Sequence, residues 1–167
     1  MPRTACPVLQ ADPGMGGPVG TAATRQSKGA LTLRFPGATD RIRSALRQAC
    51  RHLATLPVPP DRLAAIELVL AEALNNVAEH AYAGAAPGPV TLTARHDGDR
   101  LCIVLRDIGR PLPGLVPPKR TPPDLNVPTE DLPEGGFGWC LIRDLTDHVD
   151  YARHGAENRL TLEFATG

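Results

Sequence analysis

Residues 71–82 read AEALNNVAEHAY and sit inside a longer pattern that has the period of an α-helix. Apolar side chains recur there every three or four residues and form one stripe: Leu63, Ile66, Leu70, Leu74, Val77 and Ala81. This spacing predicts an amphipathic helix that is capped by Asp61 and ends near Ala81. Steps of four residues place Glu72, Asn76 and His80 along one ridge of that helix, on the side away from the apolar stripe.

The polar ridge permits two interpretations. Its side chains are compatible with an ordinary solvated face: Glu72, Asn75, Asn76 and Glu79. Asparagine is a poor residue for the middle of a helix, because its side chain competes for backbone hydrogen bonds. Two adjacent asparagines therefore favour a face with a further function, although spacing alone leaves both interpretations open.

The chain before this helix divides into a tail and the start of a domain. Residues 1–28 are rich in Pro, Gly, Ala and Thr without an apolar period, which predicts a disordered tail before one domain of residues 29–167. Alternating apolar residues predict a strand over 31–35. A helix is expected from about residue 39 to Leu56, since four apolar residues have helical spacing: Ile42, Leu46, Ala49 and Leu53.

The chain after this helix alternates between strands and one further helix. Five elements are expected: strands at 90–95 and 101–106, a helix from Gly136 to about Thr146, and strands near 148–153 and 159–164. Eight of the 18 prolines fall within residues 111–133, and so long a loop indicates a functional lid or a disordered segment. The order of elements predicts an α/β two-layer sandwich, with a mostly antiparallel sheet and helices on one face.

Two short segments contain residue types that suit a nucleotide. Asp107-Ile108-Gly109 follows a predicted strand, where a carboxylate can accept a hydrogen bond from an exocyclic amine, although Asp and Gly are also common in turns. Gly135-Gly136-Phe137-Gly138 leads into a helix, whose N-terminal N–H groups favour a phosphate, and a glycine-rich hinge is the alternative. The P-loop pattern and the pattern G-x-G-x-x-G are absent from the sequence.

Together, and in this order, these segments resemble the Bergerat-fold, histidine-kinase-like ATPase superfamily, which includes gyrase, histidine kinases and mismatch-repair ATPases. The likeness covers residues 30–165 and is closest to the anti-sigma factor serine/threonine protein kinases of bacteria. Residues 71–82 are similar to that family's first box, E-A-x-x-N-x-x-x-H-A-Y. Residues 135–143, GGFGWCLIR, are similar to its last box, G-G-x-G-x-x-L-I.

The resemblance implies a role for each matching residue. Asn76 would coordinate the Mg²⁺ that bridges the phosphates of ATP, and Glu72 would be the general base for a serine hydroxyl. Asp107 would bind the adenine amino group, and Gly109 would let the backbone approach the base. The phosphates would meet the glycine run: Gly135, Gly136, Phe137 and Gly138. His80 and Tyr82 are expected to pack and orient the end of the helix.

The sequence departs from the family in three places. The middle box is often D-x-G-x-G, whereas residues 107–111 read DIGRP and lack the second glycine. The segment 111–133 is unusually rich in proline. A threonine from a late strand often contacts the adenine, and Thr161 is the nearest candidate.

The resemblance implies a protein kinase that regulates transcription. It would phosphorylate a STAS-type anti-anti-sigma protein and sequester a sigma factor, and a homodimer is suggested. The main alternative is a non-catalytic ATP-binding module that controls a partner by binding only. A detached histidine-kinase domain ranks lower, because a helical dimerisation domain has no room here, and an α/β domain without a nucleotide ranks last.

The composition fits a soluble cytoplasmic protein. Lys plus Arg and Asp plus Glu both number 18, so a broad basic face for nucleic acid is not expected. No apolar stretch approaches the length of a signal sequence or a bilayer span, which indicates no membrane association. The four scattered cysteines lack metal-site spacing and are expected to be reduced.

Overall fold

The computed structural model describes residues 23–27, 29–118 and 137–167. Six strands form one sheet: β1 (Ala23–Ser27), β2 (Ala30–Pro36), β3 (Pro89–Asp97), β4 (Arg100–Asp107), β5 (His148–His154) and β6 (Glu157–Ala165). Their order across the sheet is β1-β2-β3-β4-β6-β5, and every neighbouring pair is antiparallel. β6 therefore lies between β4 and β5.

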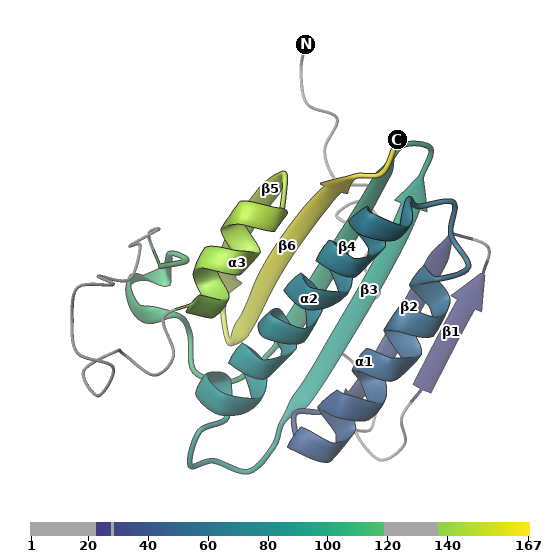
Figure 1. Cartoon of the computed structure of the whole chain (residues 1–167). Coiled ribbons are helices and arrows are strands. Elements are labelled where there is room, and N and C mark those ends of the chain that lie inside the picture. The colour runs from purple at the N-terminus through teal and green to yellow at the C-terminus, as the bar shows by residue number, and fades with distance from the viewer. Residues whose placement is uncertain (1–22, 28, 119–136) are drawn as a thin grey trace, which may run out of the picture.

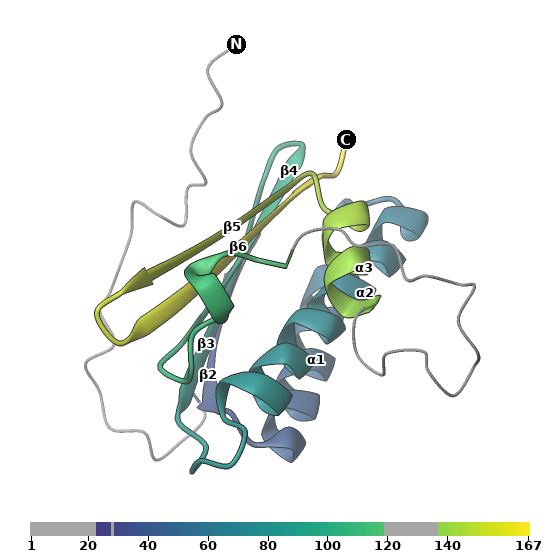
Figure 2. The ribbon, with the colours of Figure 1, turned by 90° about the vertical axis from the view of Figure 1, so that its left-hand side faces the viewer.

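The described helices lie on one face of this sheet (Figures 1 and 2). The α-helices are α1 (Thr39–Leu53), α2 (Pro60–Asn76) and α3 (Phe137–Leu145). A π-helical turn, η2 (Val77–Ala81), continues α2, and a short 3₁₀ turn, η3 (Pro113–Leu115), follows β4. The predicted two-layer α/β sandwich is confirmed.

The core lies between the sheet and the helices. Alternate residues of the strands point into it, as the burial of Leu31, Leu33 and Phe35 along β2 shows. From the helix side, Ile66 and Leu70 are fully buried. Burying one such side chain stabilises the fold by roughly 1.5–3 kcal/mol, so the apolar stripe of α2 fixes which of its faces meets the sheet. The polar ridge is thereby turned away from the core.

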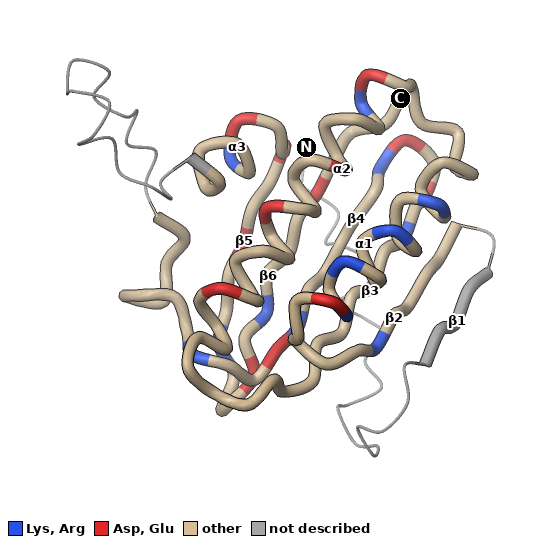
Figure 3. Tube along the Cα trace, turned by 60° about the horizontal axis from the view of Figure 1, so that its bottom comes forward, with Lys and Arg blue, Asp and Glu red and all other residues tan. Residues whose placement is uncertain are grey.

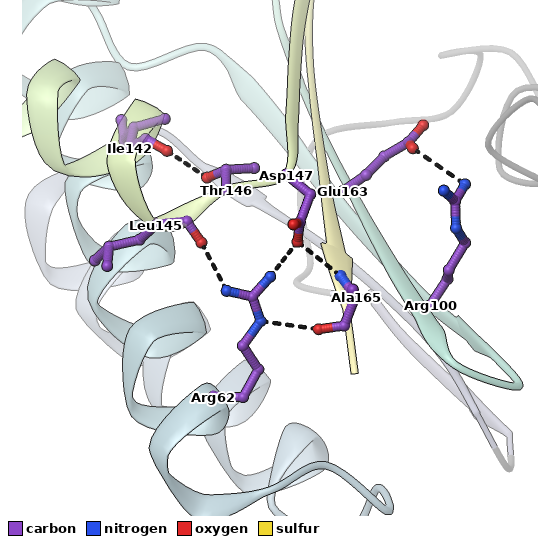
Figure 4. Close-up of polar contacts among 8 residues, drawn as sticks. All are labelled: Arg62, Arg100, Ile142, Leu145, Thr146, Asp147, Glu163 and Ala165. Carbon is purple, nitrogen blue, oxygen red and sulfur yellow. Dashed lines mark hydrogen bonds and ion pairs between the residues drawn. The ribbon is translucent and has the colours of Figure 1, made fainter. Parts of the chain in front are cut away.

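Arg62, near the start of α2, ties three elements together at one end of the molecule (Figure 4). Its guanidinium donates to the carbonyl of Ala165 at the end of β6 over 2.8 Å and to the carbonyl of Leu145 at the end of α3 over 3.2 Å. It also pairs with the Asp147 carboxylate, which accepts the backbone N–H of Ala165. The guanidinium lies 5.8 Å from the ring centre of Phe164. This cluster holds the C-terminal end of α3 beside the N-terminal end of α2.

Three expectations need correction or limitation. Residues 23–27 form β1, paired with β2, so the disordered tail does not extend to them; the remaining tail residues, 1–22 and 28, lie outside the described residues. Of the expected lid, residues 111–118 are placed and make hydrogen bonds, and residues 119–133 lie outside the described part. Cys50 and Cys140 form no disulfide, as expected, but Cys102 is disulfide-bonded, so a reduced thiol is the wrong expectation there.

No helix within residues 23–27, 29–118 and 137–167 combines the length and the apolar character that crossing a membrane needs.

Candidate functional site

Three polar side chains stand in one row across the end of the sheet. Asp107 is the last residue of β4 and is the direct cross-strand partner of Asn158 on β6. Asn158 is in turn the partner of Arg153 on β5. Cross-strand partners lie close enough for their side chains to interact, so the register alone brings Asp107, Asn158 and Arg153 together.

The Asn158 side chain is held in one orientation. Its Oδ1 atom accepts hydrogen bonds from the Tyr151 hydroxyl, over 2.8 Å, and from the Arg153 guanidinium. Because two donors fix Oδ1 as the acceptor, Nδ2 must be the donor. Nδ2 donates to Asp107 Oδ1 over 2.8 Å and to the Gly109 carbonyl over 3.2 Å.

This arrangement leaves one oxygen of Asp107 available. Oδ1 accepts both the Asn158 amide and the backbone N–H of Gly109, which donates over 2.8 Å. Oδ2 has no hydrogen-bond partner in the part of the chain that the structure describes. Burial raises the pKa of Asp107, and the bonds from Asn158 and Gly109 and the charge of Arg153 oppose that rise. The network thus favours the ionised, hydrogen-bond-accepting form.

A cavity of about 440 Å³ opens beside Asp107. This volume suits a small organic ligand. Its lining comes from α2 with η2, the end of β4 and the segment after it, α3, and the β5–β6 pair. Asn76, Asp107 and Asn158 supply polar groups, and Trp139 of α3 supplies an aromatic ring. A largely apolar cavity with a few convergent polar groups is typical of a ligand-binding site.

The predicted ridge of α2 faces this site. Asn76 and His80 line the cavity. The Asn76 Nδ2 atom is buried and has no hydrogen-bond partner among the described residues, which is costly unless a ligand satisfies the amide. Glu72 lies one turn earlier, and a Cβ atom added to Gly138 would lie 2.6 Å from its Oε2 atom. The Glu72 carboxylate therefore lies against the first turn of α3.

Gly109 has a packing role in the structure. A Cβ atom there would lie 2.4 Å from the carbonyl oxygen of Ala81, the last residue of η2. The same carbonyl accepts the backbone N–H of Arg110 over 2.8 Å. Only glycine permits this close approach of the β4 end to η2. A π-helical turn in such a place is common at functional sites.

Tyr82 orients the end of the helix, as expected. It is buried, and its hydroxyl donates to the Pro89 carbonyl over 2.9 Å and accepts the N–H of Ile108 over 3.2 Å. Burial raises the pKa of this hydroxyl. His80 differs, because it is exposed and lines the cavity instead of packing.

The glycine run is only partly visible. Gly135 and Gly136 lie outside the described residues, and Phe137 is the first residue of α3. Gly138 lies in the first turn of that helix, beside Glu72. The phosphate-binding role of this run stays a prediction.

The sequence did not point to Asn158 or Tyr151, and Thr161 was only the nearest candidate for an adenine contact from a late strand. Thr161 is buried on β6, three residues from Asn158, and so points to the sheet face opposite the helices. The cavity is lined by its neighbour Leu160. Thr161 was the wrong candidate for the adenine contact, because neighbouring residues of a strand point to opposite faces of the sheet and Thr161 points away from the cavity. Only the β4–β6 register could have identified Asn158.

Residues 35–164 match the family model of the histidine kinase-like ATPase domain. The chain belongs to this family. The match covers the sheet from the end of β2 onward and all three α-helices, and it confirms the superfamily that the two boxes indicated.

Several curated relatives are similar over a shorter segment. The serine-protein kinase RsbW of Bacillus mycoides is 33% identical over 90 residues, which are 53% of this chain and 56% of the relative. The serine/threonine-protein kinase BtrW of Bordetella bronchiseptica is 31% identical over 91 residues, 54% of this chain and 62% of the relative. RsbW of Halalkalibacterium halodurans is 34% identical over 91 residues, which are 54% of this chain and 55% of the relative. The chain therefore matches little more than half the length of these kinases.

The residues around the cavity fit ATP with Mg²⁺, the ligands that this family implies. Asp107 offers a free carboxylate oxygen for an amine, and the unpartnered Nδ2 of Asn76 is a donor that suits a phosphate oxygen. Within residues 23–27, 29–118 and 137–167 no three His, Cys, Asp or Glu side chains cluster as metal ligands. Mg²⁺ commonly binds through one or two protein oxygens together with phosphates and water, which is compatible with Asn76 as the protein ligand.

Proposed function

We propose that the protein is an ATP-dependent serine protein kinase and anti-sigma regulatory factor. In this proposal it phosphorylates a STAS-type anti-anti-sigma protein and sequesters a sigma factor. The observation that carries the catalytic part is the position of the Glu72 carboxylate against Gly138 in the first turn of α3, one helical turn from the unsatisfied amide of Asn76. The residues proposed as the base and the metal ligand thus lie one turn apart on α2, and Glu72 lies beside the first turn of α3.

The chemistry assigned to these residues is phosphoryl transfer. Glu72 accepts the proton of a serine hydroxyl while the serine oxygen forms a bond to the γ-phosphorus of ATP. The bond between that phosphorus and the oxygen bridging to the β-phosphate breaks, and ADP leaves with the electron pair. Mg²⁺, held by Asn76, would neutralise phosphate charge. Transfer of this kind depends on positioning and electrostatic stabilisation, and the Gly138 N–H lies in a helix turn suited to an anion.

Base recognition is assigned to Asp107. Its free oxygen would accept a hydrogen bond from the 6-amino group of adenine. Guanine presents a carbonyl oxygen at that position, which a carboxylate repels. A site built to satisfy one hydrogen-bonding group discriminates strongly against a base that cannot supply it, so we expect ATP to bind at least about tenfold more tightly than GTP.

The alternative is a regulatory module that binds ATP and a partner but transfers no phosphate. The placement of Glu72 favours the kinase, because a binding module needs no carboxylate beside the phosphate-binding helix turn. Cytoplasmic location, a homodimer and the lack of direct nucleic-acid binding belong to the proposal as predictions.

The deciding experiment incubates the purified protein with γ-labelled ATP, Mg²⁺ and a STAS protein encoded near it, and measures phosphoserine on the STAS protein. Labelled phosphoserine is the expected result. ATP binding without transfer to any STAS protein of the host would replace the kinase by the binding module. A pull-down of the host sigma factors tests sequestration separately, because that contact needs no phosphate transfer.

A further inference from the structure

A short segment after β4 forms one wall of the cavity. We call residues 111–118 the strap. Four of its residues line the cavity: Pro111, Leu112, Pro113 and Pro118. α2 and η2 supply another part of the lining of the same cavity. The position of the strap therefore determines the width of the space that a nucleotide would occupy.

One end of the strap is hydrogen-bonded, through Tyr151, to the row of Asp107, Asn158 and Arg153, which we call the base-recognition row. The backbone N–H of Leu112 donates to the Tyr151 hydroxyl over 3.0 Å. That hydroxyl donates in turn to Asn158 Oδ1 over 2.8 Å, and the Asn158 amide donates to the Asp107 carboxylate. A single phenol thus connects the strap to the carboxylate that is proposed to bind adenine.

The other end is fastened to α3. Arg143 donates through Nε to the Pro118 carbonyl over 2.8 Å and through Nη2 to the Pro117 carbonyl over 2.9 Å. The planar guanidinium fork bonds two successive carbonyls at once, which a lysine cannot reproduce. Trp139 lies one helical turn before Arg143 and lines the same cavity as Pro118. Arg143 thus closes the wall between the strap and α3.

The strap has few backbone donors of its own. Four of its eight residues are proline and have no N–H to donate. Gly114 and Leu115 both have positive φ, 67° and 56°, and Leu115 is half exposed. Positive φ is unfavourable in a leucine, so the intrinsic preference of its own residues does not hold this turn. Within the described residues, the hydrogen bonds that other elements make to the strap come from Tyr151 and Arg143.

We infer that Tyr151 and Arg143 are positioning residues that fasten the strap at its two ends and so set the rate at which nucleotide leaves the cavity. The inference rests on nucleotide binding, which belongs to the proposed function, but it does not require phosphate transfer. Loosening either end widens an exit route, because the strap residues are then free to move away from η2. Tyr151 has a second duty, since its hydroxyl also fixes the Asn158 amide.

The test measures nucleotide release from the full chain by stopped flow. Trp139, the only tryptophan of the sequence, lies in the cavity wall and transfers energy to the fluorescent analogue mant-ATP, which is chased with excess ATP in the presence of Mg²⁺. Arg143→Met and Tyr151→Phe should each raise the dissociation rate about 3- to 10-fold, the factor that loss of an ordinary hydrogen bond produces. Arg143→Lys should give a dissociation rate between those of the wild type and Arg143→Met, because lysine cannot bond both carbonyls.

The preference for ATP over GTP distinguishes the roles of Tyr151 and Arg143 from a general loss of packing. Tyr151→Phe should reduce the preference for ATP over GTP, because it removes one of the two donors that hold the Asn158 amide, whereas Arg143→Met should leave the preference unchanged. Arg47→Met is the control: Arg47 is exposed on α1, whose basic residues appear in Figure 3, and has no partner in the described part of the chain.

Each result has a clear meaning. Faster release by both variants, with the control at the wild-type rate, supports the inference, even if the protein proves unable to phosphorylate a partner. Release at the wild-type rate by both variants overturns it while nucleotide binding stands. A wild-type protein that binds neither mant-ATP nor ATP overturns the inference together with the proposed function.

Discussion

Asn158 donates its side-chain amide to Asp107 over 2.8 Å, and the two residues are direct cross-strand partners on β6 and β4. The bond has two consequences. It occupies one oxygen of the carboxylate and leaves the other for a ligand. It also opposes the rise in the pKa of Asp107 that burial causes.

The first prediction concerns the pH dependence of ATP binding. Adenine recognition needs ionised Asp107, so affinity should fall as the pH drops through a pKa that burial has raised above the ordinary value. Asn158→Leu removes a contact that lowers this pKa, so the fall in ATP affinity should begin at a higher pH in this variant. Titrating Trp139 fluorescence with ATP at several pH values gives the affinity at each pH. Thr161→Val is the control, because Thr161 lies on the opposite face of β6, and it should show the pH dependence of the wild type. If Asn158→Leu also shows the wild-type pH dependence, Asn158 does not take part in base recognition.

The second prediction concerns Asn76. Asn76→Ala should sharply weaken Mg²⁺–ATP binding, by at least about tenfold, because it removes the Oδ1 atom that is proposed to coordinate Mg²⁺. The loss should largely disappear when ATP is titrated in EDTA, since the proposed contact is to the metal. Calorimetry with and without Mg²⁺ measures both affinities. Asn75→Ala changes the exposed neighbouring asparagine and should behave as wild type; an equal loss in EDTA would assign Asn76 to a contact other than Mg²⁺.

The elements could be predicted from the sequence because their signals are local. Helical spacing between Leu63 and Ala81 and alternation along residues 31–35 depend on neighbours in the chain, and both elements were confirmed with ends shifted by a few residues. The predicted cap was wrong, because Asp61 lies inside the first turn and makes no capping hydrogen bond. The fold followed from the order of the elements and from the two family boxes. Burial then determined which helix face meets the sheet.

The base-recognition row could not be predicted, because it depends on a pairing between distant segments. Asp107 and Asn158 are 51 residues apart, and the residues between them include the strap, α3 and β5. Asn158 carries no sequence signal of its own, and without the register Thr161 was an equally accessible choice. The π-helical turn is similar: its sequence continues the α-helical pattern, and only the packing of Ala81 against Gly109 reveals why the backbone widens there.

The third prediction tests the contact between Gly138 and Glu72. In Gly138→Ala, the new Cβ atom would lie 2.6 Å from Glu72 Oε2, so the flexible carboxylate must move away while the backbone stays. Phosphate transfer should fall by about tenfold or more if Glu72 is the base, whereas stability should hold, since alanine is the better helix former by about 0.5–1 kcal/mol. Thermal unfolding and the transfer assay measure the two effects. In a Glu72→Ala background the second change should add little; an additive loss would place the effect elsewhere.

The fourth prediction concerns the Arg62 cluster. Arg62→Met retains much of the aliphatic stem but loses the bonds to Ala165 and Leu145 and the ion pair with Asp147. We expect a loss of about 1–3 kcal/mol in the free energy of unfolding, mostly from the two carbonyls that lose a charged donor. Asp147→Asn should cost less, within about 1 kcal/mol, because the Asp147 side chain is half exposed and its charge is screened. Urea titrations measure both values, and a loss no larger than that of Arg47→Met would show that the cluster does not stabilise the fold.

The last prediction separates the kinase from the binding module. Glu72→Gln removes the carboxylate that would accept the serine proton but leaves Asn76, Asp107 and the glycine amides in place. The variant should bind ATP within a few-fold of wild type, yet phosphorylate the STAS protein at least about 100-fold more slowly, the low end of the range for loss of a general base. Sigma-factor capture should persist, because that contact needs no chemistry. Glu79→Gln is the matched control, since Glu79 is an exposed glutamate on η2, and it should transfer phosphate normally. Normal transfer by Glu72→Gln would assign the base to another group, because the amide cannot take up the serine proton at neutral pH.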